Sequence, residues 1–169
     1  MPLPDANVEV SASSDAAENF INHYYQVINK RANLKNFYVN SSARYAIPAD
    51  ISINGSVVAT PEDYLKLLEG QGEGVHYEIE SFDTHVMNPS FQYGAPSNII
   101  ENAKLESNGS RMSIVVVTVG KVQFGPGKDA PAKMFNETFV LVPNWDSMKK
   151  NPPRGLQKWL IMSQNFRAL

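Results

Sequence analysis

Asp83 and His85 are the pair of side chains in this sequence that is best spaced for proton transfer. Residues two apart on a strand project from the same face, so a carboxylate there can orient an imidazole that acts as a general base. A solvent-facing strand shows the same alternation, and the pattern alone carries no site geometry. Further acid, base or hydroxyl groups that an enzyme could use are His23, Tyr24, Tyr45 and Asp50.

Metal and nucleotide chemistry have little support in the sequence. The chain has no cysteine, and His23, His76 and His85 fall on separate predicted elements or on opposite faces of one strand. The spacings typical of zinc, calcium and phosphate sites are absent, so the glycine-rich segments EGQGEGVH and GPGKDAP are predicted to be turns. We therefore expect neither a metal ion nor a cofactor.

Charge is divided unevenly along the chain. Residues 1–110 carry 6 Lys/Arg and 14 Asp/Glu, whereas residues 111–169 carry 9 and 3. Part of the basic charge lies near Trp145, and basic groups beside an aromatic ring can hold phosphates and stack a base. Ordinary solvated charge explains the same pattern equally well. The residues of this possible, sequence-independent RNA contact are Lys149, Lys150, Arg154 and Lys158.

Helices are predicted in the N-terminal part of the chain. Residues 1–13 are expected to form a flexible tail. Apolar residues then recur at helical spacing over 16–31, and Ser14 or Asp15 could cap the helix that this spacing predicts. A short helix is expected at 34–38.

Two local signals define the next elements. Asn54-Gly55 predicts a tight hairpin between two short strands. Thr60 and Pro61 are typical of the cap and first position of a helix, and Gly70 is expected to end that helix.

The remainder of the chain is predicted to be β-structure. Its apolar pattern shifts phase between Ile79 and Phe82, which indicates a bulge in the first long strand. Long loops are expected at 88–110 and 144–158. Helices followed by antiparallel strands indicate an α+β fold. The expected strands are 75–88, 111–124, 135–144 and 159–169.

The order of these elements resembles the nuclear transport factor 2-like family. The pattern F-x-x-T-F-x-L-x-P at 135–143 and the pattern W-x-I-x-x-x-x-F-R at 159–167 are similar to its nuclear-transport branch. The two long loops are similar to the small subunit of the fungal messenger-RNA export receptor. The resemblance covers residues 14–169, and it implies one cone-shaped domain with helices on the concave face of a strongly bent sheet.

The resemblance also implies a non-catalytic protein. The family's small subunit forms a heterodimer with the similar domain of the large export-receptor subunit, with the two sheets face to face. The pair carries messenger ribonucleoprotein, and in fungi the large pre-ribosomal subunit, through nuclear pores. The pair shuttles between nucleus and cytoplasm. Phenylalanine-glycine repeats of nucleoporins are expected to bind the small subunit directly, or to bind the complex that contains it. RNA binding is expected to be weak, and no membrane partner is expected.

Alternation along the last two strands predicts which residues meet this partner. Leu160, Met162 and Phe166 are expected in the core. The resemblance implies that Arg167 pairs with an acidic residue of the large subunit. The residues predicted for the interface are Asn136, Thr138, Val140, Ile161, Ser163, Asn165 and Arg167.

Two other functions stay open. The fold also occurs in small-molecule isomerases and dehydratases, for which Asp83 and His85 would be the candidate pair. It occurs as well in a homodimeric transport factor for the small nuclear GTPase, although the loops at 88–110 and 144–158 argue against that alternative.

Overall fold

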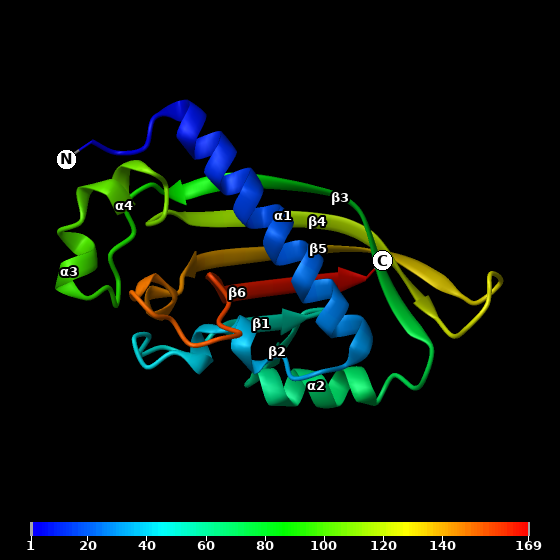
Figure 1. Cartoon of the computed structure of the whole chain (residues 1–169). Coiled ribbons are helices and arrows are strands. Elements are labelled where there is room, and N and C mark those ends of the chain that lie inside the picture. Colours follow the sequence, from blue (N-terminus) through cyan, green and yellow to red (C-terminus); the bar gives the residue numbers. More distant parts are fainter. Residues whose placement is uncertain (1, 169) are drawn as a thin grey trace.

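Six strands form one sheet in the order β2-β1-β6-β5-β4-β3 in this computed structural model, which describes residues 2–168. Neighbouring strands are antiparallel except β1 and β6, which are parallel. The long helix α1 (Ala6–Lys30) lies across one side of the sheet and the short helices α3 (Ser97–Ile100) and α4 (Ala103–Ser107) lie at one end of it, so the predicted α+β class is confirmed (Figure 1). The strands are β1 (Asp50–Ile53), β2 (Ser56–Val58), β3 (Val75–Asn88), β4 (Ser113–Phe124), β5 (Ala132–Pro143) and β6 (Trp159–Ala168).

The long helix α1 (Ala6–Lys30) crosses this sheet diagonally (Figure 1). It begins well before the predicted start at 16, and residues 6–13 are therefore helical instead of forming a tail. The cap is Asp5, whose carboxylate accepts a hydrogen bond from the Val8 backbone N–H at 2.8 Å. Three serines in the first turns have low helix propensity, which hid this start in the sequence.

Removing the true cap should weaken the protein. We expect Asp5→Ala to lower the free energy of unfolding by about 1 kcal/mol, because the Val8 N–H loses its acceptor. Ser14→Ala is the matched control: Ser14 is exposed in the helix interior, so alanine should be neutral or slightly stabilising there. Urea unfolding of both variants checks this, and the opposite order of stabilities would place the helix start near Ser14.

The local signals in residues 54–70 are confirmed. Asn54 and Gly55 adopt positive φ values of 51° and 85° in the turn between β1 and β2. Helix α2 (Pro61–Glu69) starts after Thr60, whose hydroxyl accepts from the Asp63 N–H at 3.1 Å. The short helix expected at 34–38 is the 3-10 helix η1 (Lys35–Phe37), followed by η2 (Val39–Ser41).

The segment between β3 and β4 is more ordered than a loop. It contains the short helices α3 (Ser97–Ile100) and α4 (Ala103–Ser107). Arg111 is almost fully buried beneath it, donating to the Ile100 carbonyl at 2.9 Å and to the Ser90 hydroxyl at 3.1 Å. This buried guanidinium fixes the segment against the end of the sheet.

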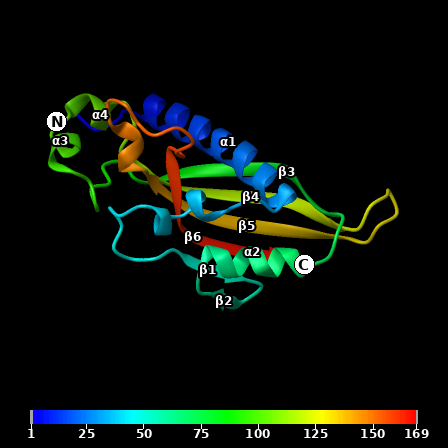
Figure 2. The ribbon, with the colours of Figure 1, turned by 60° about the horizontal axis from the view of Figure 1, so that its bottom comes forward.

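The segment after β5 packs at the same end of the molecule (Figures 1 and 2). It begins with the 3-10 helix η3 (Trp145–Met148). Trp145 is buried, stacks on Phe91 and donates its indole N–H to the Tyr93 carbonyl at 2.9 Å. The two long loops of the sequence thus support each other.

The core lies between α1 and the sheet. Phe20, Tyr24 and Tyr25 of α1 meet Phe135 and Phe139 of β5 at ring-centroid distances between 5.0 and 6.4 Å. Three register shifts interrupt the sheet. One lies between Ile79 and Ser81, where a bulge was predicted, one lies between Val86 and Asn88, and one lies on β6.

Candidate partner interface

The face of the sheet opposite α1 is the candidate partner surface, and we call it the open face. Register aligns its side chains in rows: Asn136 is opposite Arg167, and Val140 is opposite Ser163. The residues between them in sequence point into the core, because Glu137 and Phe139 are buried. The open face comprises Val115, Val117 and Val119 of β4, Met134, Asn136, Thr138 and Val140 of β5, and Ser163, Asn165 and Arg167 of β6.

Ile161 is the exception among the residues predicted for the interface, and its prediction is wrong. The register passes from Val140–Ser163 to Leu141–Ile161, which leaves Met162 as the extra residue of a bulge. The bulge reverses the alternation, so Ile161 is fully buried and forms a bridge to Tyr38. Met162, expected in the core, is only half-buried.

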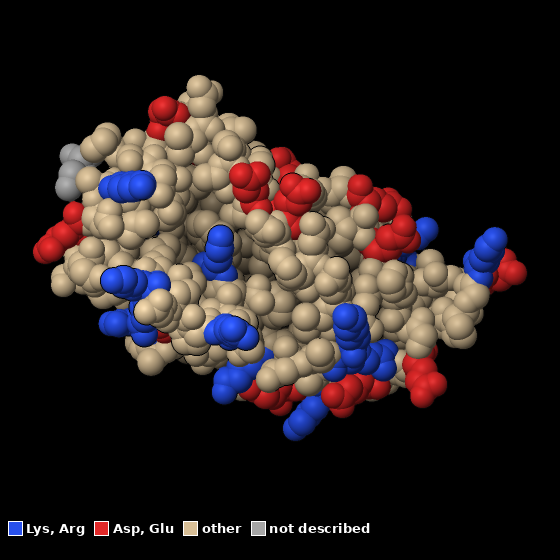
Figure 3. Space-filling view, in the orientation of Figure 1, with Lys and Arg blue, Asp and Glu red and all other residues tan. Residues whose placement is uncertain are grey.

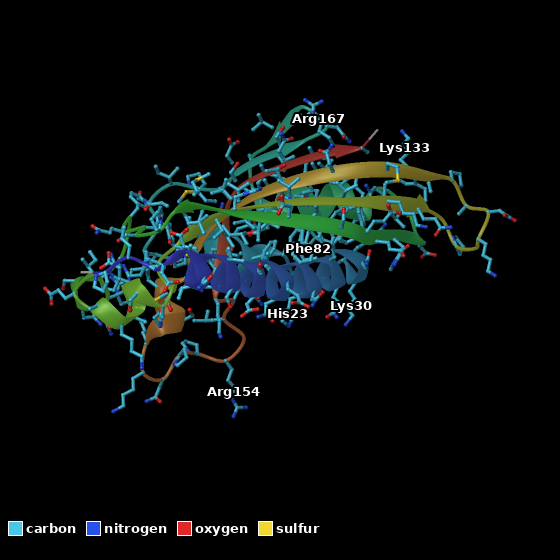
Figure 4. The ribbon with its side chains drawn as sticks, turned by 90° about the horizontal axis from the view of Figure 1, so that it is seen from above. His23, Lys30, Phe82, Lys133, Arg154 and Arg167 are labelled. Carbon is cyan, nitrogen blue, oxygen red and sulfur yellow. The ribbon has the colours of Figure 1, made fainter. Side chains whose placement is uncertain are left out.

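Arg167 presents a cation at the border of the open face. It lies within β6 opposite Asn136, so it is an ordered strand residue. Figure 4 shows its side chain on the side of the sheet opposite α1. A Cβ on Gly55 would lie 3.7 Å from its guanidinium, which places that group beside the β1–β2 turn. Within residues 2–168 it makes no salt bridge, so it can pair with an acidic group from outside.

The open face has an apolar middle and a polar border. Val119 and Met134 are 38% and 41% exposed, which is high for side chains of these types. Asparagine and serine side chains of β5 and β6 flank the valines. A desolvated apolar centre with a polar rim is the anatomy of protein–protein interfaces.

The candidate catalytic pair also lies on this side, at the outer strand β3. The Nε2 atom of His85 is 3.0 Å from the Oδ2 atom of Asp83, so the predicted contact exists. The two side chains are 69% and 72% exposed, and neither lines the two hollows that border α1. A pair so open to water lacks the enclosure that general-base catalysis uses.

The remaining candidate catalytic groups are dispersed. His23 and Asp50 are exposed on α1 and β1, and Tyr24 is fully buried. The Tyr45 hydroxyl donates to the Pro143 carbonyl. Within the described residues 2–168, no three His, Cys, Asp or Glu side chains are grouped to hold a metal ion. No helix there is long and apolar enough to cross a membrane.

Glu137 is a buried ionisable residue that the sequence analysis did not single out. It is 1% exposed, and its carboxyl oxygens lie 2.6 Å from the Tyr25 hydroxyl and 2.6 Å from Nε2 of Gln164. Burial raises its pKa to about 7, although these two hydrogen bonds oppose the rise. The alternation with Phe135 and Phe139 was a usable signal, since it places Glu137 on their buried face.

A neutral Glu137 would satisfy the hydroxyl groups around it. Thr118 donates to the Glu137 backbone carbonyl at 3.1 Å, and its hydroxyl lies 3.0 Å from that of Tyr25. While Tyr25 donates to Glu137 Oε1, no hydrogen is left for the Tyr25–Thr118 contact. A protonated carboxyl that donates to Tyr25 would free the Tyr25 hydrogen for Thr118.

The basic cluster lies away from the open face. Lys149, Lys150, Arg154 and Lys158 are exposed, and Lys149 lies 3.2 Å from Asp146. Figure 4 shows Arg154 on the side of the sheet where α1 lies. The expectation that Trp145 could stack a base there is wrong, because its ring is buried.

Comparison with known proteins gives matches among solved structures. No protein-family model matches the sequence, and no curated protein matches it. A structure of Mtr2 is 34% identical over 93% of this chain and 99% of its own, with a TM-score of 0.83. A chain of the Mex67:Mtr2 complex with a Sac3N peptide is 37% identical over 93% and 99%, with a TM-score of 0.84. A chain of the Chaetomium thermophilum Mex67 NTF2-like domain complexed with Mtr2 is 36% identical over 93% of this chain and 98% of its own, with a TM-score of 0.84.

A more distant match shows the fold alone. A putative scytalone dehydratase from Novosphingobium aromaticivorans is 12% identical over 98% of this chain and 89% of its own, with a TM-score of 0.58. The predicted fold is therefore confirmed by proteins of different functions, and the fold by itself does not select among them.

Proposed function

Because this chain belongs to the Mtr2 family of nuclear transport factor 2-like proteins, we propose that it is the small, non-catalytic subunit of a heterodimer with a Mex67-type large subunit. The observation that carries the proposal is the open face, an apolar surface with a polar border on a chain similar to Mtr2 over nearly its whole length. Two such faces packed together would bury the valines of β4, which the isolated chain leaves partly exposed.

The role that follows is nuclear export. The heterodimer would carry messenger ribonucleoprotein, and also the large pre-ribosomal subunit, through nuclear pores, and it would shuttle between nucleus and cytoplasm. Nucleoporin phenylalanine-glycine repeats would contact it directly or through the large subunit. A Sac3N-type peptide is a further candidate ligand of the assembled pair, by similarity to the Mex67:Mtr2 complex.

The isomerase or dehydratase alternative has less support. The likeness to a dehydratase extends to the fold only. Asp83 and His85 lie on exposed β3, and the interior groups Tyr24, Glu137 and Gln164 are closed off from solvent by each other.

Arg167 provides the test of the heterodimer. We expect Arg167→Ala to weaken the complex with a Mex67-type NTF2-like domain roughly tenfold or more, because a desolvated partner carboxylate would lose its guanidinium. Isothermal titration calorimetry with the purified domain measures this. Arg154→Ala removes the same side chain on the opposite side of the molecule and should leave the affinity unchanged. If the unmodified chain forms no complex, or only a homodimer, the proposed function fails.

RNA contact by the basic cluster is a smaller part of the same proposal. Neutralising Lys149 and Lys150 together should weaken binding of single-stranded RNA and lower the slope of log affinity against log salt by roughly 0.7 per lost phosphate contact. Fluorescence anisotropy over a salt series measures both quantities. Lys66→Ala on α2 is the control, since Lys66 is exposed but distant in sequence from the cluster. An unchanged salt slope in the double variant would rule out the contact.

A further inference from the structure

A groove lies between α1 and the segment that leads into β6. It encloses about 290 Å³ and is half open to solvent. Phe20 forms part of its floor, Trp159 is half-buried, and Leu156 is 36% exposed at its edge. The lining residues are Asn19, Phe20, His23, Gly155, Leu156, Gln157, Lys158 and Trp159. A hollow of this size, with Phe20, Leu156 and Trp159 among its lining residues, accepts one large apolar side chain.

The loop wall of the groove is held in place by a buried residue. Asn144, which is 3% exposed, donates its backbone N–H to the Lys158 carbonyl at 2.9 Å. Its side-chain amide donates to the Gln157 carbonyl at 2.8 Å. Since Asn144 fixes two successive carbonyls of this wall, the groove exists before any ligand binds, and less ordering entropy opposes binding.

Lys158 is the charged side chain among the residues that line the groove. The lining contains Lys158 and His23 but no Asp or Glu. Arg154 extends the basic border along the same loop. Asp15 and Glu18 lie N-terminal to Asn19 on α1, so an acidic ligand would run away from them, towards Arg154.

We propose that this groove binds an acidic peptide segment that inserts one large apolar side chain between Phe20 and Leu156. Lys158 and Arg154 would face the acidic residues that flank the inserted side chain. The groove lining itself offers one lysine and one histidine instead of the strip of cations that follows a phosphate backbone, so the RNA contact proposed above would rest on Lys149 and Lys150, outside the groove.

The groove is separate from the open face. Figure 3 shows the side of the molecule on which α1 lies, with Asp and Glu along its upper part and Lys and Arg mainly in the lower part, where further acidic groups lie at the edge. In Figure 4, His23 and Arg154 lie on that side, whereas Arg167 lies on the other. A peptide in the groove therefore leaves the open face accessible, and the inference does not depend on the proposed heterodimer.

A set of labelled peptides tests this. Each carries one central Leu, Ile, Met, Phe or Trp, flanked on both sides by Asp and Glu, by Ser, or by Lys, and binding to the full chain is followed by fluorescence anisotropy. We expect at least one acidic peptide to bind with a Kd below about 100 μM, and the Ser- and Lys-flanked versions to bind at least about tenfold more weakly.

Matched variants locate the site. Lys158→Glu should weaken the acidic peptide roughly tenfold, and Leu156→Ser about fivefold. Lys30→Glu and Leu67→Ser make the same changes at exposed positions outside the groove, and should have no effect. The proposal fails if no acidic peptide binds, if the Ser-flanked peptides bind equally well, or if the groove variants bind like the wild type. It also fails if single-stranded RNA binds through Leu156 and the peptides do not.

Discussion

A lysine in place of Val140 should abolish the heterodimer with a Mex67-type NTF2-like domain while the chain itself stays folded. Val140 lies in the middle of the open face, opposite Val115 on β4 and Ser163 on β6. No acidic side chain is its direct neighbour in that row to pair with a new ammonium group. An unpaired charge buried between two sheets costs roughly 3–5 kcal/mol, which is on the order of 100- to 4,000-fold in affinity.

The control is the same change on another surface. Val10 is 66% exposed on α1, and Val10→Lys should leave both folding and heterodimer affinity unchanged. Sedimentation velocity of each variant mixed with the partner domain gives the fraction in complex, and circular dichroism confirms the fold. Should Val140→Lys unfold the chain, Val119→Lys, at a position 38% exposed on the same face, replaces it. A Val119→Lys or Val140→Lys complex of wild-type affinity would exclude the open face as the interface.

Local sequence signals predicted the elements that depend on local chemistry. The Asn54-Gly55 turn and the Thr60 cap each need only neighbouring residues, and both occur as expected. The start of α1 was missed because a serine-rich stretch has weak local preference. Packing against the rest of the protein stabilises this first part of α1 instead, since Ser13, Ala16 and Ala17 are buried.

The residues of the open face were predictable except where the register depends on another strand. Alternation placed Asn136, Asn165 and Arg167 on the open face, because strand side chains alternate with a period of two. Ile161 was misplaced because the bulge at Met162 exists only through the pairing of β6 with β5. A single strand's sequence does not contain that information.

The burial of Trp145 between the two long loop segments could not be predicted from the sequence either. The basic residues near Trp145 in the sequence led to the prediction that its ring could stack on a base. Its ring is covered by Phe91 and its N–H is taken by the Tyr93 carbonyl, both from the distant 88–110 segment. Contacts between two irregular segments have no periodicity from which to predict them.

Glu137 should make the protein less stable as pH rises from about 4.5 to about 7. Its pKa is raised from 4.5 to about 7 in the folded state, so the folded chain holds a proton that the unfolded chain has released over this range. The stability is complete below pH 4.5, falls as pH rises, and reaches its lower value above pH 7. At 1.36 kcal/mol per pKa unit, the loss from this group is on the order of 3 kcal/mol.

Glu137→Gln should remove that loss. A glutamine amide can accept from Gln164 and donate to the Tyr25 hydroxyl, whose own hydrogen can then go to Thr118. These are the hydrogen bonds that a neutral Glu137 carboxyl would make. The variant should therefore match the wild type near pH 4.5 and be roughly 3 kcal/mol more stable near pH 8. Urea unfolding across this pH range measures both, and Glu80→Gln on the exposed edge of β3 should keep the wild-type slope.

Comparing the two profiles isolates this carboxyl from every other titrating group. Parallel curves for the wild type and Glu137→Gln would mean that the folded protein holds Glu137 ionised. In that case Tyr25 would donate to a carboxylate, and the Thr118 hydroxyl would divide its one hydrogen between Tyr25 and the Glu137 carbonyl. Curves that converge at low pH and diverge above pH 7 would show that a neutral acid joins α1 to β4, β5 and β6, directly behind the open face.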